Sequence, residues 1–90
     1  MKLEILELDI YKHVTYREQV AKIFEEIQEY KESDNFENEV EEICDVIQAM
    51  FGGLRALENE GKINVPEAWQ KHRKKLLDRQ NAKGGGKREG

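Results

Sequence analysis

Two pairs of carboxylates with matched spacing are the residues of this sequence best suited to chemistry. Glu26 and Glu29 lie three residues apart, and so do Glu42 and Asp45. Side chains three or four residues apart share one face of a helix, so each pair can direct two carboxylates toward one point. Carboxylate oxygens, completed by water or phosphate oxygens, suit Mg²⁺, with Mn²⁺ as a second candidate. The spacing indicates a divalent-metal site if the two helices face each other.

A solvated helix surface is the alternative explanation for the same residues. Asp and Glu make up 19 of the 90 residues, and in so acidic a chain one such pair usually marks only a charged face. Two matched pairs across one short turn are harder to explain in this way. Like charges on one helix face are mildly destabilising unless a cation compensates them.

The first element that must position these groups is an amphipathic helix. Thr15 and Glu18 have the spacing of a capping box, which satisfies free N–H groups at a helix start. From Tyr16 onward apolar residues recur with helical period, and the pattern predicts a helix that ends at about Lys31 or Glu32.

A second amphipathic helix carries the other carboxylate pair. Polar residues 33–35 favour a turn and an N-cap, and periodic apolar residues follow from Phe36 to a stop near 59–61. Helices joined by so short a loop are expected to pack antiparallel. The acidic face of this helix continues into Gly52 and Gly53. Glycine inside a helix costs about 1 kcal/mol relative to alanine, so the pair indicates either room for a ligand or close approach of another helix.

The remaining segments flank this hairpin. The chain opens with an apolar segment, helical or partly extended, and Pro66 marks the start of a last helix. From Gln80 onward the sequence lacks periodic apolar positions and contains three consecutive glycines, which predicts a disordered tail. The expected fold class is all-α. One domain would span residues 1–79, with a disordered Gly/Lys-rich tail over 80–90.

Composition limits the binding partners, the cellular location and the oligomeric state that we expect for the protein. The net charge of -4 argues against a broad nucleic-acid-binding surface. Cys44 is the single cysteine, which excludes an intrachain disulfide and favours the cytoplasm. No signal-peptide pattern opens the chain, and no apolar run approaches the roughly 20 residues of a membrane span. A chain of 90 residues has a marginal core, so we expect a homodimer or homotetramer built as a four-helix-type bundle.

Charge is unevenly distributed along the chain. Acidic residues concentrate between Glu25 and Glu42, whereas the last helical stretch is basic. This asymmetry fits a site for a metal and an anion together, and it equally fits charge pairing between subunits. Lys75 and Arg79, one turn apart, are candidates for phosphate contacts, or simply cations near a helix C-terminus, where they are favoured.

Two stretches together resemble a known signature. The sequence QVAKIFEEIQE (19–29) followed by EEICDV (41–46) is similar to the Glu-Glu-x-x-Glu, spacer, Glu-x-x-Asp signature of the MazG-like all-α nucleoside triphosphate pyrophosphohydrolases. The similarity covers roughly 15–79, and Cys44 stands where the family often has glycine. The residues that match the signature are Glu25, Glu26, Glu29, Glu42 and Asp45.

The resemblance implies a function and a set of roles. Such proteins hydrolyse (deoxy)nucleoside triphosphates, with Mg²⁺, to monophosphate and pyrophosphate, as nucleotide-pool housecleaning enzymes. Glu25 would orient or deprotonate the attacking water, although a metal ligand can also do so. Lys22, one turn before the acidic motif, would pair with a ligand or contact phosphate. The implied metal ligands are Glu26, Glu29, Glu42 and Asp45.

Other functions remain open at this point. A related enzyme could act on phosphoribosyl-ATP, or prefer deoxyuridine or deoxycytidine nucleotides. A different class is a non-catalytic helical dimerisation or adaptor module, whose acidic face binds a basic partner without metal. Trp69 could stack on a base, or pack in a core or subunit interface.

Overall fold

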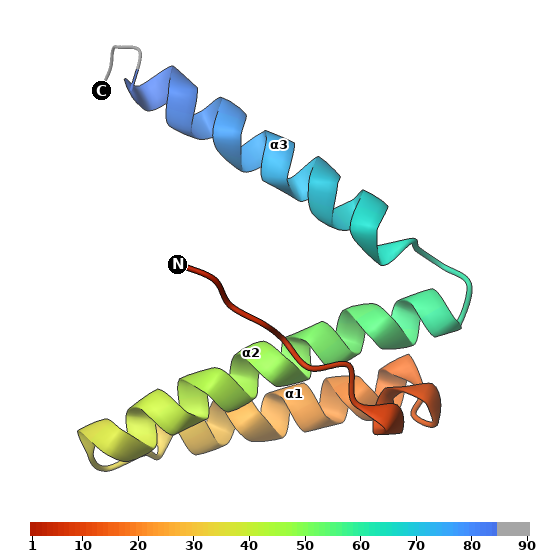
Figure 1. The fold of residues 1–90 in the computed structure, drawn as a ribbon. Coiled ribbons are helices and arrows are strands. Elements are labelled where there is room, and N and C mark those ends of the chain that lie inside the picture. The colour runs from red at the N-terminus through yellow and green to blue at the C-terminus, as the bar shows by residue number, and fades with distance from the viewer. Residues whose placement is uncertain (85–90) are drawn as a thin grey trace.

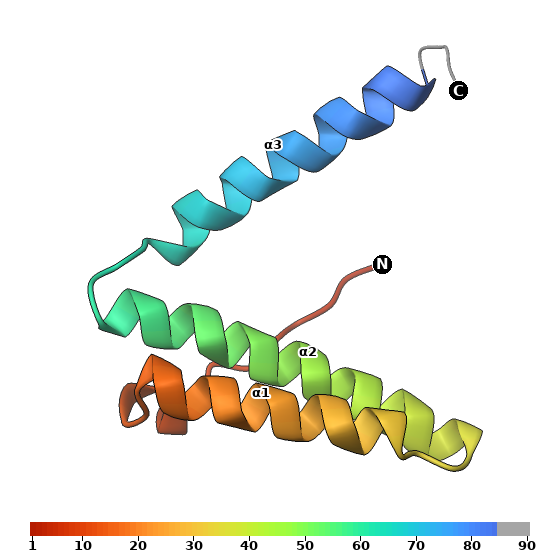
Figure 2. The ribbon, with the colours of Figure 1, turned by 180° about the vertical axis from the view of Figure 1, so that it is seen from behind.

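The computed structural model describes residues 1–84, and the regular structure within that range is entirely helical. A short 3₁₀ helix, η1 (Asp9–Lys12), precedes α1 (Tyr16–Lys31), α2 (Phe36–Asn59) and α3 (Val65–Gly84). Figure 1 shows α1 and α2 lying side by side as an antiparallel hairpin, with α3 leaving the end of α2 as a separate arm. The opposite view in Figure 2 shows the same arrangement. The all-α class and the hairpin are therefore as predicted.

The helices begin and end at the signals that the sequence contains. Thr15 Oγ1 accepts the N–H of Glu18 at 3.1 Å, and the Glu18 carboxylate accepts the N–H of Thr15 at 2.8 Å, which confirms the capping box. At the start of α2 the Asn35 side chain accepts the N–H of Asn38 at 2.8 Å. Gly61, just after α2, has a φ of 76°, a conformation that glycine adopts without strain.

The hairpin packs closely where α2 carries small residues. A Cβ at Gly52 would lie 2.6 Å from both Gln19 Nε2 and Tyr11 Cε1, and a Cβ at Gly53 would lie 3.2 Å from Ile23 Cδ1. The protein's own side chains therefore fill the space beside the glycine pair. Close approach, and not room for a ligand, explains these two residues. The buried residues of α2 are Ala49, Gly52, Gly53 and Ala56.

Polar contacts attach the N-terminal segment to α2. Gln48 Nε2 donates to the Leu6 carbonyl at 2.8 Å, and Gln48 Oε1 accepts the Leu6 N–H at 3.2 Å. The Tyr11 hydroxyl donates to the Gln48 carbonyl at 3.0 Å, while Asn59 Nδ2 donates to the Tyr11 carbonyl at 2.8 Å. Residues before η1 thus have a defined position without forming a helix or strand (Figure 1).

The end of α3 differs from the prediction. The helix continues through Gln80 to Gly84, so the first part of the segment expected to be disordered is helical. Gln80, Ala82 and Lys83 are good helix formers and continue α3 up to the first glycine of the run. The rest of that segment, 85–90, lies outside the described residues. Among the helices of residues 1–84, none is long and apolar enough to cross a membrane.

Candidate metal centre

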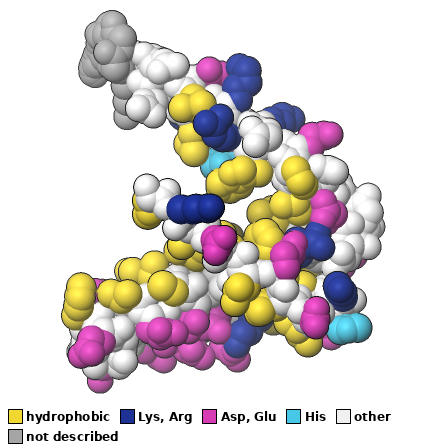
Figure 3. All heavy atoms as spheres, in the orientation of Figure 1, with side chains coloured by type: hydrophobic (Ala, Val, Ile, Leu, Met, Phe, Trp, Pro, Cys, Tyr) yellow, Lys and Arg dark blue, Asp and Glu magenta, His cyan; other side chains and the backbone are white. Residues whose placement is uncertain are grey.

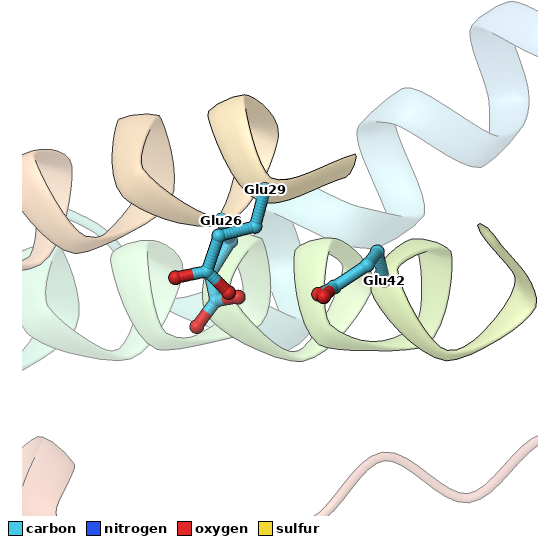
Figure 4. A group of neighbouring side chains, drawn as sticks. All are labelled: Glu26, Glu29 and Glu42. Atoms are coloured by element: carbon cyan, nitrogen blue, oxygen red, sulfur yellow. The ribbon is translucent and has the colours of Figure 1, made fainter. Parts of the chain in front are cut away.

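Three carboxylates meet between the two helices of the hairpin. Glu26 and Glu29 project from α1 and Glu42 projects from α2, and one oxygen of each lies within 4.8 Å of the others. Figure 4 shows the three side chains directed toward one another across the α1–α2 interface. We call Glu26, Glu29 and Glu42 the acidic cluster. The antiparallel hairpin thus brings three of the four predicted metal ligands together.

Two oxygens of the acidic cluster lack hydrogen-bond partners. Glu26 is only 7% exposed and Glu42 is half-buried. Oε1 of each is buried, and neither accepts a hydrogen bond from any described residue. A buried carboxylate oxygen without a donor or cation is costly. The donor set, all carboxylate oxygen with unsatisfied lone pairs, fits a hard divalent cation such as Mg²⁺.

The electrostatics of the cluster follow from this crowding. The negative charge of Glu26 is the main cause that raises the pKa of Glu29. Burial from water is the main cause that raises the pKa of Glu42, and the neighbouring Asp45 carboxyl adds to it. A cation among these carboxylates would favour their charged forms and reverse both shifts.

Lys22 is the basic residue beside the acidic cluster. Its Nζ lies 2.8 Å from Glu26 Oε2 and 3.0 Å from Glu25 Oε1. Hydrogen bonds to Glu26 and then Glu25 raise the pKa of Lys22 well above its usual value. Of the two roles predicted for Lys22, pairing with a predicted metal ligand is therefore the one seen. Glu25, the predicted catalytic carboxylate, is half-exposed next to this ammonium.

Asp45 is positioned differently from the other predicted ligands. It is not one of the three residues whose oxygens lie within 4.8 Å, but it is half-buried and lies three residues after Glu42 on α2. Its place one turn along α2 puts it at the edge of the acidic cluster. There it can join a metal's ligand set or hold the Glu42 carboxylate in position.

Lys75 and Arg79 lie away from the acidic cluster. Both are exposed on α3, and within residues 1–84 that helix packs slightly on α2 and not on α1. Figure 3 shows acidic side chains gathered along the edge of the hairpin that faces away from α3, while basic side chains line α3 itself. The predicted phosphate contacts are therefore not brought to the cluster within a single chain.

A cavity beside the acidic cluster is a feature that the sequence did not predict. Its walls include Lys22, Glu26 and Asp45 on one side and Leu8, Ile10 and Val14 on the other. The residues from the N-terminal segment carry no periodic signal in the sequence. Their position depends on Gln48 and Tyr11, which lie far apart in the chain.

No family model, curated protein or solved structure matches the chain. The resemblance to the MazG-like signature is one of residue types and spacing in the sequence.

Proposed function

We propose that the protein is a Mg²⁺-dependent pyrophosphohydrolase of (deoxy)nucleoside triphosphates, of the MazG-like kind. The supporting observation is the acidic cluster, in which carboxylates from two antiparallel helices converge and two buried oxygens have no partner. A triphosphate is strongly anionic, and such a cluster would repel it without a divalent cation between them. Release of monophosphate and pyrophosphate is consistent with a role in maintaining the nucleotide pool.

Each residue of the site has a role in this proposal. Glu26, Glu29 and Glu42 hold Mg²⁺, with Asp45 at the edge of the set. When bound, Mg²⁺ offsets phosphate charge and lowers the pKa of a water molecule. Glu25, half-exposed and close to the cluster, orients that water and accepts its proton.

These roles define the steps of the proposed reaction. The water oxygen bonds to the α-phosphorus, one water proton passes to Glu25, and the bond from the α-phosphorus to its bridging oxygen breaks. Pyrophosphate leaves with the electron pair. Lys22, released from its carboxylate partners, can neutralise phosphate charge at the edge of the site. Lys75 and Arg79 could contact phosphate only in an assembly that places α3 beside the cluster.

A homodimer or homotetramer is part of the proposal. An open groove of about 950 Å³ separates α2 from α3, and its walls are largely apolar. Figure 3 shows hydrophobic side chains facing this opening. A small chain with so few buried apolar side chains gains stability when a second copy covers such a surface. Residues that line the groove include Leu3, Ile5, Met50, Leu54, Val65 and Trp69.

The same groove favours one competing function, a helical adaptor without catalysis. In that case the apolar groove and the acidic edge of the hairpin would bind a protein partner of basic charge. An adaptor needs no metal, whereas the pyrophosphohydrolase does. The two functions therefore differ in one measurable property.

Pyrophosphate release distinguishes them. The purified protein is incubated with each common NTP and dNTP, and with phosphoribosyl-ATP, with and without Mg²⁺. We expect Mg²⁺-dependent release from at least one nucleotide, and loss of that release in Glu42→Gln, which keeps the side-chain shape but removes the charge.

Glu41→Gln is the matched control. Glu41 is the neighbouring glutamate on α2, is exposed, and does not belong to the acidic cluster. We expect the Glu41→Gln variant to release pyrophosphate at the same rate as the wild type. If the wild type releases pyrophosphate from none of these substrates, the proposed function is wrong.

A further inference from the structure

A cavity of about 390 Å³ opens directly beside the acidic cluster. This volume lies within the range of small-molecule sites, roughly 300–1,000 Å³. Glu26, a member of the cluster, forms part of the cavity wall together with Lys22 and Asp45. The remaining walls come from α1, α2 and the segment before α1. Any ligand with a phosphate at the cluster would therefore have its next part at the mouth of this cavity.

Long-range contacts hold the outer wall of the cavity in place. Leu8, Ile10 and Val14 form this wall, from a segment that has little regular structure. On one side, the Gln48 amide bonds both backbone groups of Leu6. In the same segment, Glu7 forms an ion pair of 2.9 Å with Arg55 of α2. The wall is thus built by specific polar contacts.

The amide groups of Gln48 and Gln19 and the Tyr11 hydroxyl, which lie around the cavity, already donate hydrogen bonds to the protein. Gln48 Nε2 donates to the Leu6 carbonyl and to the Tyr11 hydroxyl, the latter at 2.6 Å. The Tyr11 hydroxyl donates to the Gln48 carbonyl, and Gln19 Nε2 donates to the Ala49 carbonyl at 3.0 Å. Tyr11 and Gln19 are both buried. The cavity therefore offers a ligand mainly apolar surface, with charged groups at the end next to the cluster.

We infer that this cavity holds the nucleoside part of the substrate while the phosphates lie at the acidic cluster. The inference rests on the proposed function and adds the location and mode of base recognition. The flat face of a base can pack against apolar cavity walls, and the sugar would lie between the base and Lys22. Because the donors of Gln48, Tyr11 and Gln19 are engaged with the protein, the base is held mainly by shape and apolar contact, and these three side chains donate no hydrogen bond to its edge.

This mode of binding limits how strongly the protein can discriminate between nucleotides with different bases. Sites that hydrogen-bond a substrate group reject analogues lacking it by roughly 10⁴–10⁵-fold, whereas apolar pockets separate similar ligands by roughly 10–200-fold. We therefore expect the values of kcat/KM for the different bases to lie within about 100-fold of one another.

Reducing the cavity volume tests its role. Ile10 lines the cavity and is 54% exposed, so Ile10→Trp adds bulk at a position where the fold tolerates it. Calorimetry would measure binding of a nucleoside monophosphate, of pyrophosphate and of Mn²⁺ alone. In Ile10→Trp we expect affinity for the nucleoside monophosphate to fall at least about tenfold, with affinities for pyrophosphate and Mn²⁺ unchanged.

Leu77→Trp on α3 is the control for an added indole. Leu77 is 40% exposed and does not line the cavity or the α2–α3 groove. We expect the Leu77→Trp variant to bind the nucleoside monophosphate, pyrophosphate and Mn²⁺ with the same affinities as the wild type. If Ile10→Trp binds the monophosphate as tightly as wild type, or if wild type separates the bases by more than about 10⁴-fold, the cavity assignment is wrong.

Failure of the inference can be told from failure of the proposed function. A wild type that releases pyrophosphate from nucleotides, with Ile10→Trp unaffected, overturns the cavity assignment alone. A wild type that binds Mn²⁺ but neither binds nor hydrolyses any nucleotide overturns both.

Discussion

Glu26 is the most constrained residue of the acidic cluster. One of its oxygens pairs with Lys22 at 2.8 Å, and the other is buried without a partner. Even residues that only support a metal ligand change metal affinity by roughly 10–100-fold when replaced. We therefore expect Glu26→Gln to weaken Mn²⁺ binding at least about tenfold in a calorimetric titration.

The control for this prediction is again Glu41→Gln, which removes one negative charge outside the cluster. If both variants bind Mn²⁺ equally well, the unpartnered oxygen of Glu26 is not a ligand, and the ion responds only to overall charge.

Crowded carboxylates also predict a pH dependence of stability. The pKa values of Glu29 and Glu42 are raised above the ordinary glutamate value. Each carboxyl binds its proton more tightly in the folded state, so its stabilising effect is complete below the unfolded pKa and is lost as pH rises through the folded pKa. In metal-free buffer we expect a higher Tm at pH 5 than at pH 7, with Mg²⁺ reducing the difference.

Glu60 sets the lower limit of this experiment. A hydrogen bond from the Tyr16 N–H, 2.7 Å long, lowers the pKa of Glu60, so its contribution is lost as pH falls through that lowered value. Measurements above pH 5 avoid this effect. A Tm that rises steadily from pH 5 to pH 7 without metal would contradict the prediction.

The packing of α2 against η1 and α1 depends on the close approach at Gly52. A Cβ there would meet the ring of Tyr11, whose hydroxyl is hydrogen-bonded to Gln48 and whose side chain is buried. Overpacking of this kind costs about 1–3 kcal/mol, against roughly 1 kcal/mol that alanine gains over glycine in a helix. We expect Gly52→Ala to lower the free energy of unfolding by about 1–2 kcal/mol in urea titrations.

Gly53→Ala provides the comparison within the same helix turn. The nearest atom to its Cβ is the end of the flexible Ile23 side chain, at 3.2 Å. A small shift of Ile23 relieves this contact, and the gain in helix propensity offsets it, so we expect a change below about 1 kcal/mol. Equal destabilisation by both substitutions would show that the contact between Gly52 and Tyr11 of η1 does not limit how closely α2 packs.

Sequence patterns predicted these elements well where local rules apply. The capping box at Thr15, the N-cap at Asn35 and the short turn between them determine the hairpin, and each acts over a few residues. The sequence alone could not show whether the glycine pair makes room for a ligand or for another part of the protein. The answer depends on Tyr11 and Gln19, which lie outside α2. The N-terminal segment was not predictable for a similar reason, since hydrogen bonds to distant residues on α2 determine its path.

Across the whole molecule, much apolar surface remains uncovered in a single chain. Met50 on α2 is 52% exposed and Trp69 on α3 is 54% exposed, and both line the groove between these helices. We expect the wild type to be a dimer or tetramer by light scattering coupled to size-exclusion chromatography. Met50→Lys should shift it to monomer, because the charge would be buried in an apolar interface.

Gln28→Lys is the control, because it adds the same charge at an exposed position of α1 outside the groove. We expect this variant to have the same oligomer mass as the wild type. Circular dichroism should show equal helix content in both variants. A wild type that is monomeric at every concentration would contradict the assembly.

Only part of the site could be predicted from the sequence. The predictable part depends on contacts within the hairpin, and the rest depends on how more distant elements are arranged. Helical spacing and antiparallel packing were enough to anticipate that Glu26, Glu29 and Glu42 would converge. Helical spacing could not place Lys75 and Arg79, because their distance from the cluster depends on the direction in which α3 leaves α2.

The attachment of the N-terminal segment has a consequence for how the cavity beside α1 and α2 opens. Gln48 reaches a backbone 42 residues away in the sequence, and its contacts are exposed to solvent. Exposed hydrogen bonds in a segment with little burial open locally, at far lower free energy than global unfolding. If the cavity holds a nucleoside as inferred above, local opening of this segment would admit or release it while the hairpin beneath stays intact. The residence time of the ligand would then depend on the N-terminal segment, and the lifetime of the fold on the hairpin.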